Sequence, residues 1–317
     1  MNFHALPKTD HHHHLFLGGR RQRIETLFGV SLLDFTDFRP EICRNRGKTP
    51  SAAAIGRISE WIRQEYFPIC AHENFLEFAV RAALEAAAED NVRRLETSVN
   101  LTFPAFFQLS AFDFLTRLRN VHQEAAPEMK FFLDLGISRT EPADTQFAWF
   151  QEFLDVKPDF DSPRFGISGI DLYDVEDTAR DADFRGFFTL AGHHGLKRKA
   201  HIGEFSPAES VPAAVEMLEL DEIQHGVHAG DSPEIARRLA RQKTRVNISP
   251  ASNEILDAID FSRNPHPLRV LYDAGVNFSL ATDDLMLFGK TITDQAISLV
   301  EQGVFTAEEV AGMIRPI

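Results

Sequence analysis

Lys199-Ala200-His201-Ile202-Gly203-Glu204 closes a β-type run and stands just before a helix start. That helix start is Ser206-Pro207-Ala208-Glu209, which has the pattern of a capping box with proline at the first helical position. The order predicts a strand that ends near Gly203, a short loop and then a helix. It puts His201 at the C-terminal end of the strand and Glu204 on the loop above it. In βα barrels, active-site residues gather at that end of the strands.

Seven further β-type runs alternate with helical patterns, and this alternation is typical of βα units and of a parallel sheet. Together with Lys199–Gly203 they make eight strands, the number that closes a barrel. The sequence therefore predicts an α/β fold, specifically a (β/α)8 TIM barrel. The seven other runs are Lys8–His14, Val92–Ser98, Lys130–Ile137, Phe165–Leu172, Glu222–Gly226, Thr244–Ile248 and Val276–Ala281.

The segment from about residue 18 to residue 91 departs from this alternation of strands and helices. It contains two helical stretches, Ala52–Tyr66 and Glu73–Glu89, before the second strand begins. We interpret it as a helical insertion after strand 1, near the barrel mouth. No repeat, linker or low-complexity tract divides the chain, so residues 1–317 are expected to form a single domain.

The composition is that of an ordinary globular protein with a strongly acidic balance. Among 317 residues, 33 are Lys or Arg and 47 are Asp or Glu, which gives a formal net charge of −14. This balance disfavours a nucleic-acid partner, which needs clustered positive charge, and fits a small-molecule partner better. The two cysteines, Cys43 and Cys70, are too few for a disulfide framework. With no signal-peptide pattern and no long apolar run, we expect a cytoplasmic protein without a membrane span.

Three other strand ends carry residues that can bind a metal or move a proton. Four consecutive histidines, His11–His14, end the first strand, and because side chains alternate between its faces only a pair such as His12 and His14 can converge on one ion. A purification tag and an adventitious surface metal site are alternative interpretations. Two later strands end in Gln224-His225-Gly226 and Thr282-Asp283-Asp284. Each motif alone is compatible with a structural role, but their joint occurrence at strand ends indicates an active site.

With these motifs in order, the sequence resembles the adenosine deaminase family. The likeness is dense from about residue 165 to residue 290, is present at the N-terminus and is faint across the insertion. The matching motifs are Leu6-Pro7-Lys8-Thr9-Asp10 with His12-His13-His14-Leu15, the H-x-G-E motif His201–Glu204, the x-H-G motif Gln224-His225-Gly226, the turn Ser249-Pro250-Ala251-Ser252-Asn253, and a closing block of His266-Pro267-Leu268, Asp273-Ala274-Gly275-Val276 and Thr282–Gly289.

The resemblance implies one zinc ion per chain at the barrel mouth. Three imidazoles and one carboxylate are suitable zinc donors and leave a position for water, whose pKa the metal lowers to about 7. It also sets the register of the histidine run, so that His11 and His13 are expected on the opposite face in structural or supporting roles. The implied ligands are His12, His14, His201 and Asp283.

The resemblance also assigns roles to the other polar residues of the set. His225 would orient the attacking water and help to accept its proton, next to Asp283. Glu204, protonated, would donate to the ring nitrogen beside the carbon that carries the amine. Asp284 would hydrogen-bond another ring nitrogen and hold the heterocycle. The Pro-Cys-x-x-Cys signature of cysteine-ligated nucleobase deaminases is absent.

Two departures from the family pattern fall on expected substrate contacts. Phe16 stands where the family usually has an acidic residue that binds a ribose hydroxyl, and a buried hydroxyl without a partner costs about 1–3 kcal/mol. Tyr173 and Asp174 stand where the family has Ala-Gly against the purine edge. We therefore expect an altered aminopurine or a related aminated heterocycle, in preference to adenosine, with an apolar group near Phe16. The alternative is that the insertion supplies substitute polar contacts.

The sequence thus predicts a zinc-dependent hydrolytic deaminase of an aminopurine, purine nucleoside or related aminated heterocycle that releases ammonia. One alternative is another metal-dependent amidohydrolase that cleaves an amide, ester or phosphoester, and another is a catalytically silent binding protein on the same scaffold. Glu204 and Asp284 favour the deaminase, because protonating and holding ring nitrogens is their natural use. Whether the chain forms a homo-oligomer stays open.

Overall fold

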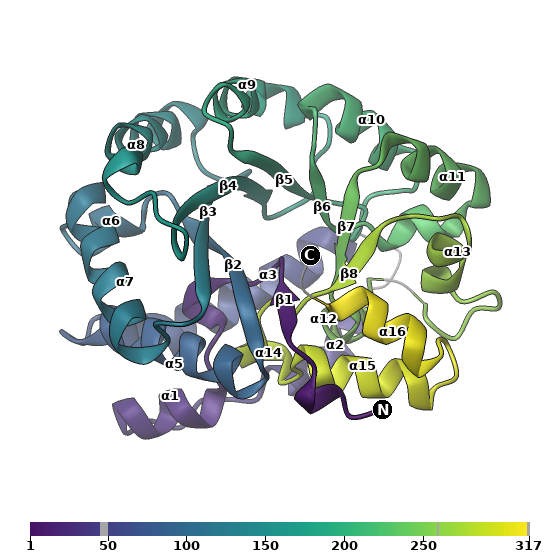
Figure 1. Ribbon diagram of the computed structural model, residues 1–317, viewed down its shortest axis with the longest axis horizontal. Helices are drawn as coiled ribbons and strands as arrows, with labels where there is room; N and C mark the ends of the chain where they lie inside the picture. Colours follow the sequence, from purple (N-terminus) through teal and green to yellow (C-terminus); the bar gives the residue numbers. More distant parts are fainter. Residues whose placement is uncertain (45–49, 259, 316–317) are drawn as a thin grey trace.

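The computed structural model describes residues 1–44, 50–258 and 260–315, and its eight strands form one parallel sheet in the order β1 to β8. Helices surround this ring of strands (Figure 1). An isolated parallel bridge between His13 and Asp283 joins the segments that follow β1 and β8. The predicted TIM barrel is confirmed. The strands are β1 Lys8–Asp10, β2 Val92–Asn100, β3 Lys130–Ser138, β4 Phe165–Tyr173, β5 Lys197–Ile202, β6 Glu222–His225, β7 Arg245–Ile248 and β8 Phe278–Leu280.

The first strand is shorter than predicted, because it ends at Asp10 and not at His14. The Asp10 carboxylate accepts a hydrogen bond from the backbone N–H of His12 (3.3 Å) and another from that of Thr282 (3.2 Å). A side-chain acceptor of this kind competes with the regular strand pattern and turns the chain. The histidines therefore follow the strand, and their backbone pairs with the barrel through isolated bridges, such as the one between His14 and Ser98.

The helix after β5 also starts later than predicted. It begins at Ser210, and the Ser206 hydroxyl does not cap it. Ser206 Oγ instead accepts a hydrogen bond from the backbone N–H of Gly203 at 2.9 Å, within the loop that follows the strand. The capping box predicted from the sequence was wrong, because its serine belongs to the loop.

The outer helices are α7 Ala111–Ala125, α8 Ala143–Val156, α9 Arg185–His193, α10 Ser210–Leu218, α11 Pro233–Gln242, α13 Pro267–Asp273, α15 Ile292–Glu301 and α16 Ala307–Ile314, and shorter ones are α6 Phe103–Phe106, α12 Pro250–Ile255 and α14 Leu285–Phe288.

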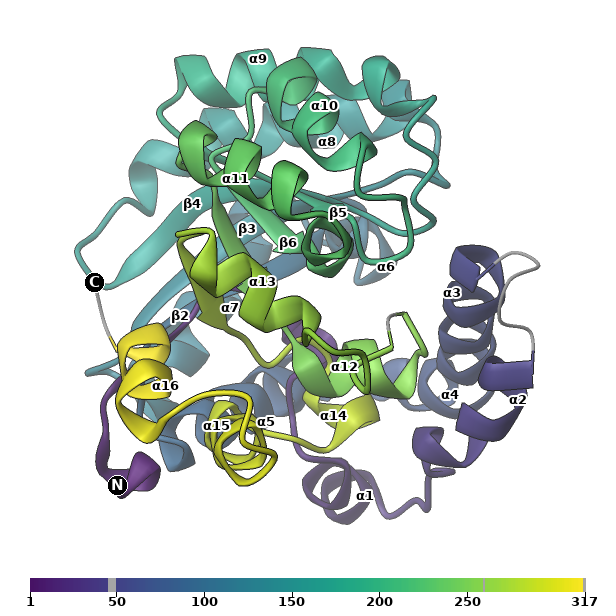
Figure 2. The same ribbon diagram turned by 90° about the vertical axis from the view of Figure 1, so that its right-hand side faces the viewer.

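The segment between β1 and β2 is helical, and its parts lie in two places. Helix α5 (Phe75–Glu89) packs beside α7 in the outer ring. Helices α2, α3 and α4 stand apart from the ring (Figure 2). In the described ranges, no helix is long and apolar enough to cross a membrane. The other elements of this segment are α1 Arg21–Phe28, α2 Arg39–Arg44, α3 Pro50–Trp61, the π-helical turn Ile62–Tyr66 and α4 Phe67–Cys70.

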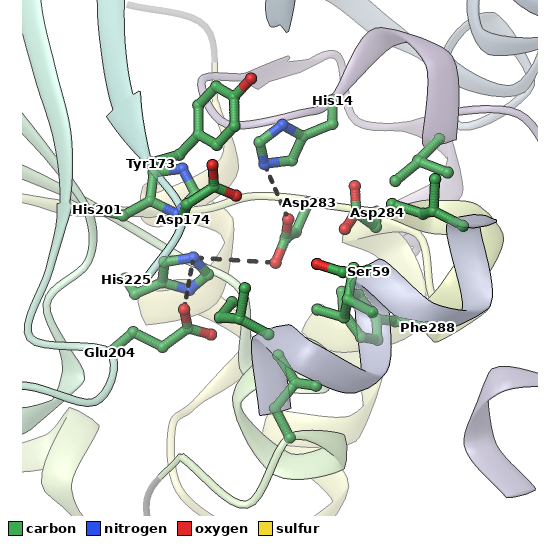
Figure 3. A pocket seen from close by; sticks show the side chains of 15 residues that line it. His14, Ser59, Tyr173, Asp174, His201, Glu204, His225, Asp283, Asp284 and Phe288 are labelled. Atoms are coloured by element: carbon green, nitrogen blue, oxygen red, sulfur yellow. Dashed lines mark ion pairs between the residues drawn. The ribbon is translucent and has the colours of Figure 1, made fainter. Parts of the chain in front are cut away.

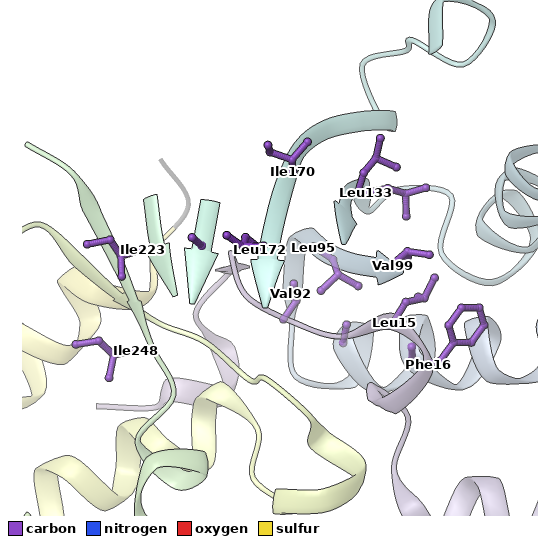
Figure 4. Packing of buried hydrophobic residues seen from close by; sticks show 14 of the residues in the cluster. Leu15, Phe16, Val92, Leu95, Val99, Leu133, Ile170, Leu172, Ile223 and Ile248 are labelled. Atoms are coloured by element: carbon purple, nitrogen blue, oxygen red, sulfur yellow. The ribbon is translucent and has the colours of Figure 1, made fainter. Parts of the chain in front are cut away.

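Apolar side chains fill the layer between the sheet and the helices, whereas charged groups lie inside the barrel. Leu95, Leu133 and Ile170 represent the apolar layer (Figure 4). Inside, the fully buried ammonium of Lys199 lies 2.6 Å from Glu96 Oε2 and 2.7 Å from Asp134 Oδ2. Burial lowers the pKa of Lys199, but these carboxylates outweigh it and hold the pKa well above its usual range. The lysine is therefore charged, and it neutralises the acidic interior beneath the barrel mouth.

Lys199→Met is expected to lower the free energy of unfolding by about 3–5 kcal/mol, because it leaves buried carboxylates without their counter-ion. Urea denaturation of the metal-loaded protein measures this loss. Lys197→Met is the control: Lys197 reaches Glu222 from the same strand, its side chain is 37% exposed, and its loss is expected to cost about 1 kcal/mol or less. Equal losses in the two variants would show that the interior charges do not stabilise the barrel in this way.

Candidate active site

A cavity of about 140 Å³ opens beyond the C-terminal ends of the strands. Helix α3 of the β1–β2 segment covers one side of it through Ile55, Ile58 and Ser59 (Figure 3). His12 lies beside the cavity with its ring centroid 4.7 Å from that of His201. Most of the residues predicted for the site therefore meet around one small space. The predicted residues that line the cavity are His14, Tyr173, Asp174, His201, Glu204, His225, Asp283 and Asp284.

The predicted metal ligands lie close together around His12. His12 Nε2 and His14 Nε2 each lie 3.5 Å from Asp283 Oδ1. Candidate ligand atoms of His12, His14 and Asp283 all lie within 4.8 Å of one another, and the same holds for His12, His201 and His225. His12 belongs to both groups, so each of the other predicted ligands shares a group with it.

His12 tests whether these residues fit a metal ion. Among the described residues, neither of its ring nitrogens has a hydrogen-bond partner, although the side chain is buried. Burial lowers the pKa of His12 to about 4, so the imidazole is neutral and offers a lone pair. A buried polar group without a partner is costly, and a divalent cation would satisfy it. The donor set fits a metal.

Two polar contacts hold the ring and the backbone of His201 in place. Its Nε2 lies 3.4 Å from Asp171 Oδ2, and its backbone carbonyl accepts a hydrogen bond from Arg139 Nη2 at 3.0 Å. Burial raises the pKa of Asp171, but the neighbouring His201 imidazole outweighs burial and holds the pKa of this carboxyl below its usual range. In metal sites, carboxylates that contact a ligand histidine orient its ring in this way. No role was predicted for Asp171 or Arg139 from the sequence.

Three residues of the cavity have left-handed backbone conformations that residues other than glycine rarely adopt. Asp283 has φ +62°, His225 has φ +67° and Asp174 has φ +73°. The backbone N–H of Asp283 donates to the carbonyl of His12 at 2.9 Å, which ties the last strand end to the first. Backbone strain of this kind is typical of sites whose surroundings hold a side chain in one direction.

Glu204 and His225 form the acid–base part of the site. His225 Nε2 lies 3.6 Å from Glu204 Oε2, and Asn253 Nδ2 donates to His225 Nδ1 at 3.0 Å and to Glu204 Oε1 at 3.4 Å. Burial raises the pKa of Glu204 well above its usual range, and the negative charges of Asp283 and nearby acids act in the same direction. Both effects favour the protonated form of Glu204. From the sequence, Asn253 was recognised only as part of a turn.

Asp284 is placed to hold a ligand. Burial raises its pKa to about 7, and its Oδ1 has no hydrogen-bond partner among the described residues. Its carboxyl lies at the cavity near Ser59 of helix α3 (Figure 3). The group can thus accept a hydrogen bond from a bound molecule when ionised, or donate one when protonated.

The structure does not bring Phe16 to the cavity. Its short 3₁₀ turn, Leu15–Leu17, directs this ring into an aromatic cluster, 4.4 Å from Phe103 and 5.8 Å from Phe75 between ring centroids. Leu17 lines the cavity in its place. The position of Phe16 therefore does not support the expected contact with substrate, because the ring packs in the aromatic cluster and not at the cavity.

Tyr173 and Asp174 do lie in the cavity wall. The Tyr173 hydroxyl accepts a hydrogen bond from Asn100 Nδ2 at 2.6 Å. Asp174 has φ +73°, and its carboxylate accepts hydrogen bonds from Ser138 Oγ and from Thr140 Oγ1. A left-handed conformation is one that glycine adopts most easily, and aspartate is among the few other residues that tolerate it. The cavity wall therefore turns at Asp174 in a conformation typical of glycine, and it carries a hydrogen-bonded carboxylate at that point.

Comparison with known proteins identifies the family. Residues 69–315 match the family model described as adenosine deaminase. A protein from Treponema pallidum named "putative adenosine/adenine deaminase" is 33% identical over 305 residues, which are 96% of this chain and 94% of that protein. The chain belongs to the adenosine deaminase family. This membership confirms the predicted resemblance and makes the chain a hydrolytic deaminase that acts on a carbon–nitrogen bond.

Solved structures agree with this member of the adenosine deaminase family in fold. The adenine deaminase of Arthrobacter aurescens superposes with a TM-score of 0.76 at 21% identity, over 98% of this chain and 91% of that one. An amidohydrolase from Burkholderia ambifaria with bound zinc has a TM-score of 0.75 at 22% identity and covers 98% and 84%. The N6-mAMP deaminase of arabidopsis has a TM-score of 0.74 at 18% identity, over 98% and 91%.

Proposed function

We propose that this chain is a zinc-dependent deaminase whose substrate is an uncharged aminopurine base or a similar aminated heterocycle. The observation that carries the proposal is one small cavity in which candidate metal donors lie beside the buried carboxyl group of Glu204, whose pKa burial raises. Metal donors activate water, and the protonated carboxyl can give its proton to a ring nitrogen. These are the two things that hydrolytic removal of a ring amine requires.

One zinc ion per chain would be held by His12, His14, His201 and Asp283. Imidazole and carboxylate donors suit zinc, and the family relative from Burkholderia ambifaria was crystallised with zinc. Bound there, zinc supplies Lewis-acid activation of water near neutral pH. The unpartnered ring of His12 supports this assignment, since without a cation that ring would be buried at a cost.

The remaining residues would orient water and move protons. Asn253 Nδ2 lies 3.0 Å from Nδ1 of His225, and the other ring nitrogen, Nε2, faces Glu204 and Asp283. His225 would orient the attacking water from this position and help to accept its proton. Glu204 would donate its proton to the ring nitrogen beside the carbon under attack, and Asp284 would hydrogen-bond a second ring nitrogen.

The cavity favours a small uncharged substrate over a nucleotide. No lysine or arginine occurs among the described residues that line it, whereas four carboxyl groups do, those of Asp174, Glu204, Asp283 and Asp284. Its volume of about 140 Å³ lies below the range of about 300–1,000 Å³ that is usual for sites of drug-sized ligands. A phosphate would find no cationic side chain in this wall and would meet the Asp174 carboxylate, and a ribose would meet apolar side chains such as Leu17 and Ile58.

Ammonia release from adenine, adenosine and AMP, measured on the zinc-loaded protein, tests this specificity. We expect kcat/KM for adenine to exceed that for AMP by at least about 100-fold, because like-charge contacts cost several kcal/mol and each 1.4 kcal/mol is about tenfold. Adenosine should fall between the two. A higher kcat/KM for AMP or adenosine than for adenine would overturn the specificity proposal, and acid release without ammonia would overturn the deaminase assignment.

A further inference from the structure

Glu176, in the loop between β4 and α9, binds the loop that carries Glu204. Its Oε2 accepts hydrogen bonds from the backbone N–H groups of Gly203 and Ser206, each at 2.9 Å. Its Oε1 accepts from those of Glu204 at 2.8 Å and Phe205 at 3.3 Å. Four successive amides therefore point at one carboxylate. Consecutive backbone N–H groups arranged in this way form a concave site for an anion, which here is a side chain of the same protein.

The Gly203 amide has a second acceptor, Ser206 Oγ at 2.9 Å, but the helix that follows the loop offers no support to these amides. Helix α10 begins only at Ser210, so its N-terminus does not satisfy them. Gly203 has φ +73°, and a Cβ added there would meet Val211 Cγ2 at 2.6 Å and Gly226 Cα at 3.3 Å. The loop must therefore leave β5 by this one route, close to the strand end that carries His225. The Glu176 carboxylate neutralises the partial positive charges that the route exposes.

We infer that Glu176 is a positioning residue for the proton donor Glu204, which it holds through the backbone of residues 203–206. The inference rests on the proposed function, in which Glu204 gives its proton to the substrate. The hydrogen bond to the Glu204 amide fixes the point from which that side chain reaches the cavity, and Asn253 then fixes its far end. Catalytic groups must be held to within about 0.5 Å of the productive geometry, so loss of this anchor affects the chemical step.

Glu176→Gln tests the inference, because glutamine keeps the shape but has one acceptor oxygen for four donors. We expect kcat for ammonia release to fall about 10–100-fold, as for misplacement of a catalytic group by about 1 Å. KM should stay within about threefold and zinc content at one per chain, since the cavity wall and the metal donors are untouched. Glu209→Gln is the control: it removes an exposed carboxyl five residues after Glu204, and kcat should not change.

A double-mutant cycle with Glu204→Gln separates positioning from a general structural role. If Glu176 acts through Glu204, adding Glu176→Gln to the Glu204→Gln protein changes the small residual kcat by less than about twofold. A loss of the same size in both backgrounds, or full kcat in Glu176→Gln, would overturn the inference. If Glu176→Gln does not fold, Glu176→Asp replaces it, because aspartate keeps the negative charge on a side chain that is shorter by one carbon. We expect its kcat to lie between that of the unmodified protein and about a 100-fold loss. An unchanged kcat in Glu176→Asp would contradict the inference. Failure of the proposed function would instead appear as no ammonia release by the unmodified protein.

Discussion

Glu204→Gln lowers kcat for deamination by about 10²–10⁴-fold and leaves the zinc content unchanged, the size of effect expected for removal of a general acid. Glutamine preserves the volume of the side chain and an acceptor for Asn253 Nδ2, so the buried environment is kept. It cannot, however, deliver the proton that burial and nearby negative charge hold on Glu204. Parallel measurement of ammonia release and of zinc per chain checks both halves of the expectation.

Two results for Glu204→Gln would contradict this prediction. Retention of kcat within about threefold of the unmodified protein would mean that another group donates the proton, because general acid catalysis contributes at least about 10²-fold. Loss of zinc together with activity would mean that Glu204 belongs to the metal site. Glu209→Gln serves as the matched control, since it removes an exposed carboxyl from the same region without touching the cavity.

The meeting of the candidate site residues could be predicted from the sequence, because the fold itself brings strand ends together. His201 and His225 lie at the C-terminal ends of β5 and β6, and Asp283 follows β8; in a parallel barrel the C-terminal ends of all strands share one face. Residues far apart in the chain therefore meet without any need to predict their contacts one by one. The choice of His12 and His14 came from the resemblance to the adenosine deaminase family, because the alternation of side chains in a strand allows more than one pair, and the histidines follow β1 instead of lying in it.

Features that depend on long-range contacts could not be predicted. The early end of β1 is due to hydrogen bonds between Asp10 and Thr282, which are 272 positions apart. The absence of Phe16 from the cavity is due to an aromatic cluster with Phe75 and Phe103, from two other segments. Neither partner can be identified from the local pattern around the residue that it redirects.

The cavity wall and its supports were missed for a similar reason. Helix α3 was predicted, but nothing in its sequence indicated that Ile55 and Ile58 would cover the site. Glu176 carries one usable signal, because it is an acidic residue in the loop directly after β4, at the catalytic end of the barrel. Its four amide partners lie on the neighbouring β5 loop, and that adjacency becomes visible only once the strand order is known.

His201→Ala and Asp283→Ala are expected to lose zinc and to lower kcat by at least about 10³-fold, because the metal contributes several kcal/mol to the reaction. Both residues supply donors to one small cluster, and removing either leaves His12 and His14 without a complete site. Zinc analysis and ammonia release check the two effects. His193→Ala is the control, since this exposed histidine ends helix α9 away from the cavity.

The most direct measurement of the central claim is the amount of zinc bound per chain in the unmodified and His201→Ala proteins after equal loading and dialysis. The proposal that three imidazoles and Asp283 hold one ion predicts one zinc in the unmodified protein, with ammonia release in proportion to occupancy. It predicts well under one zinc in His201→Ala. Stoichiometric zinc in His201→Ala, or full ammonia release by the unmodified protein stripped of metal, would contradict the assignment.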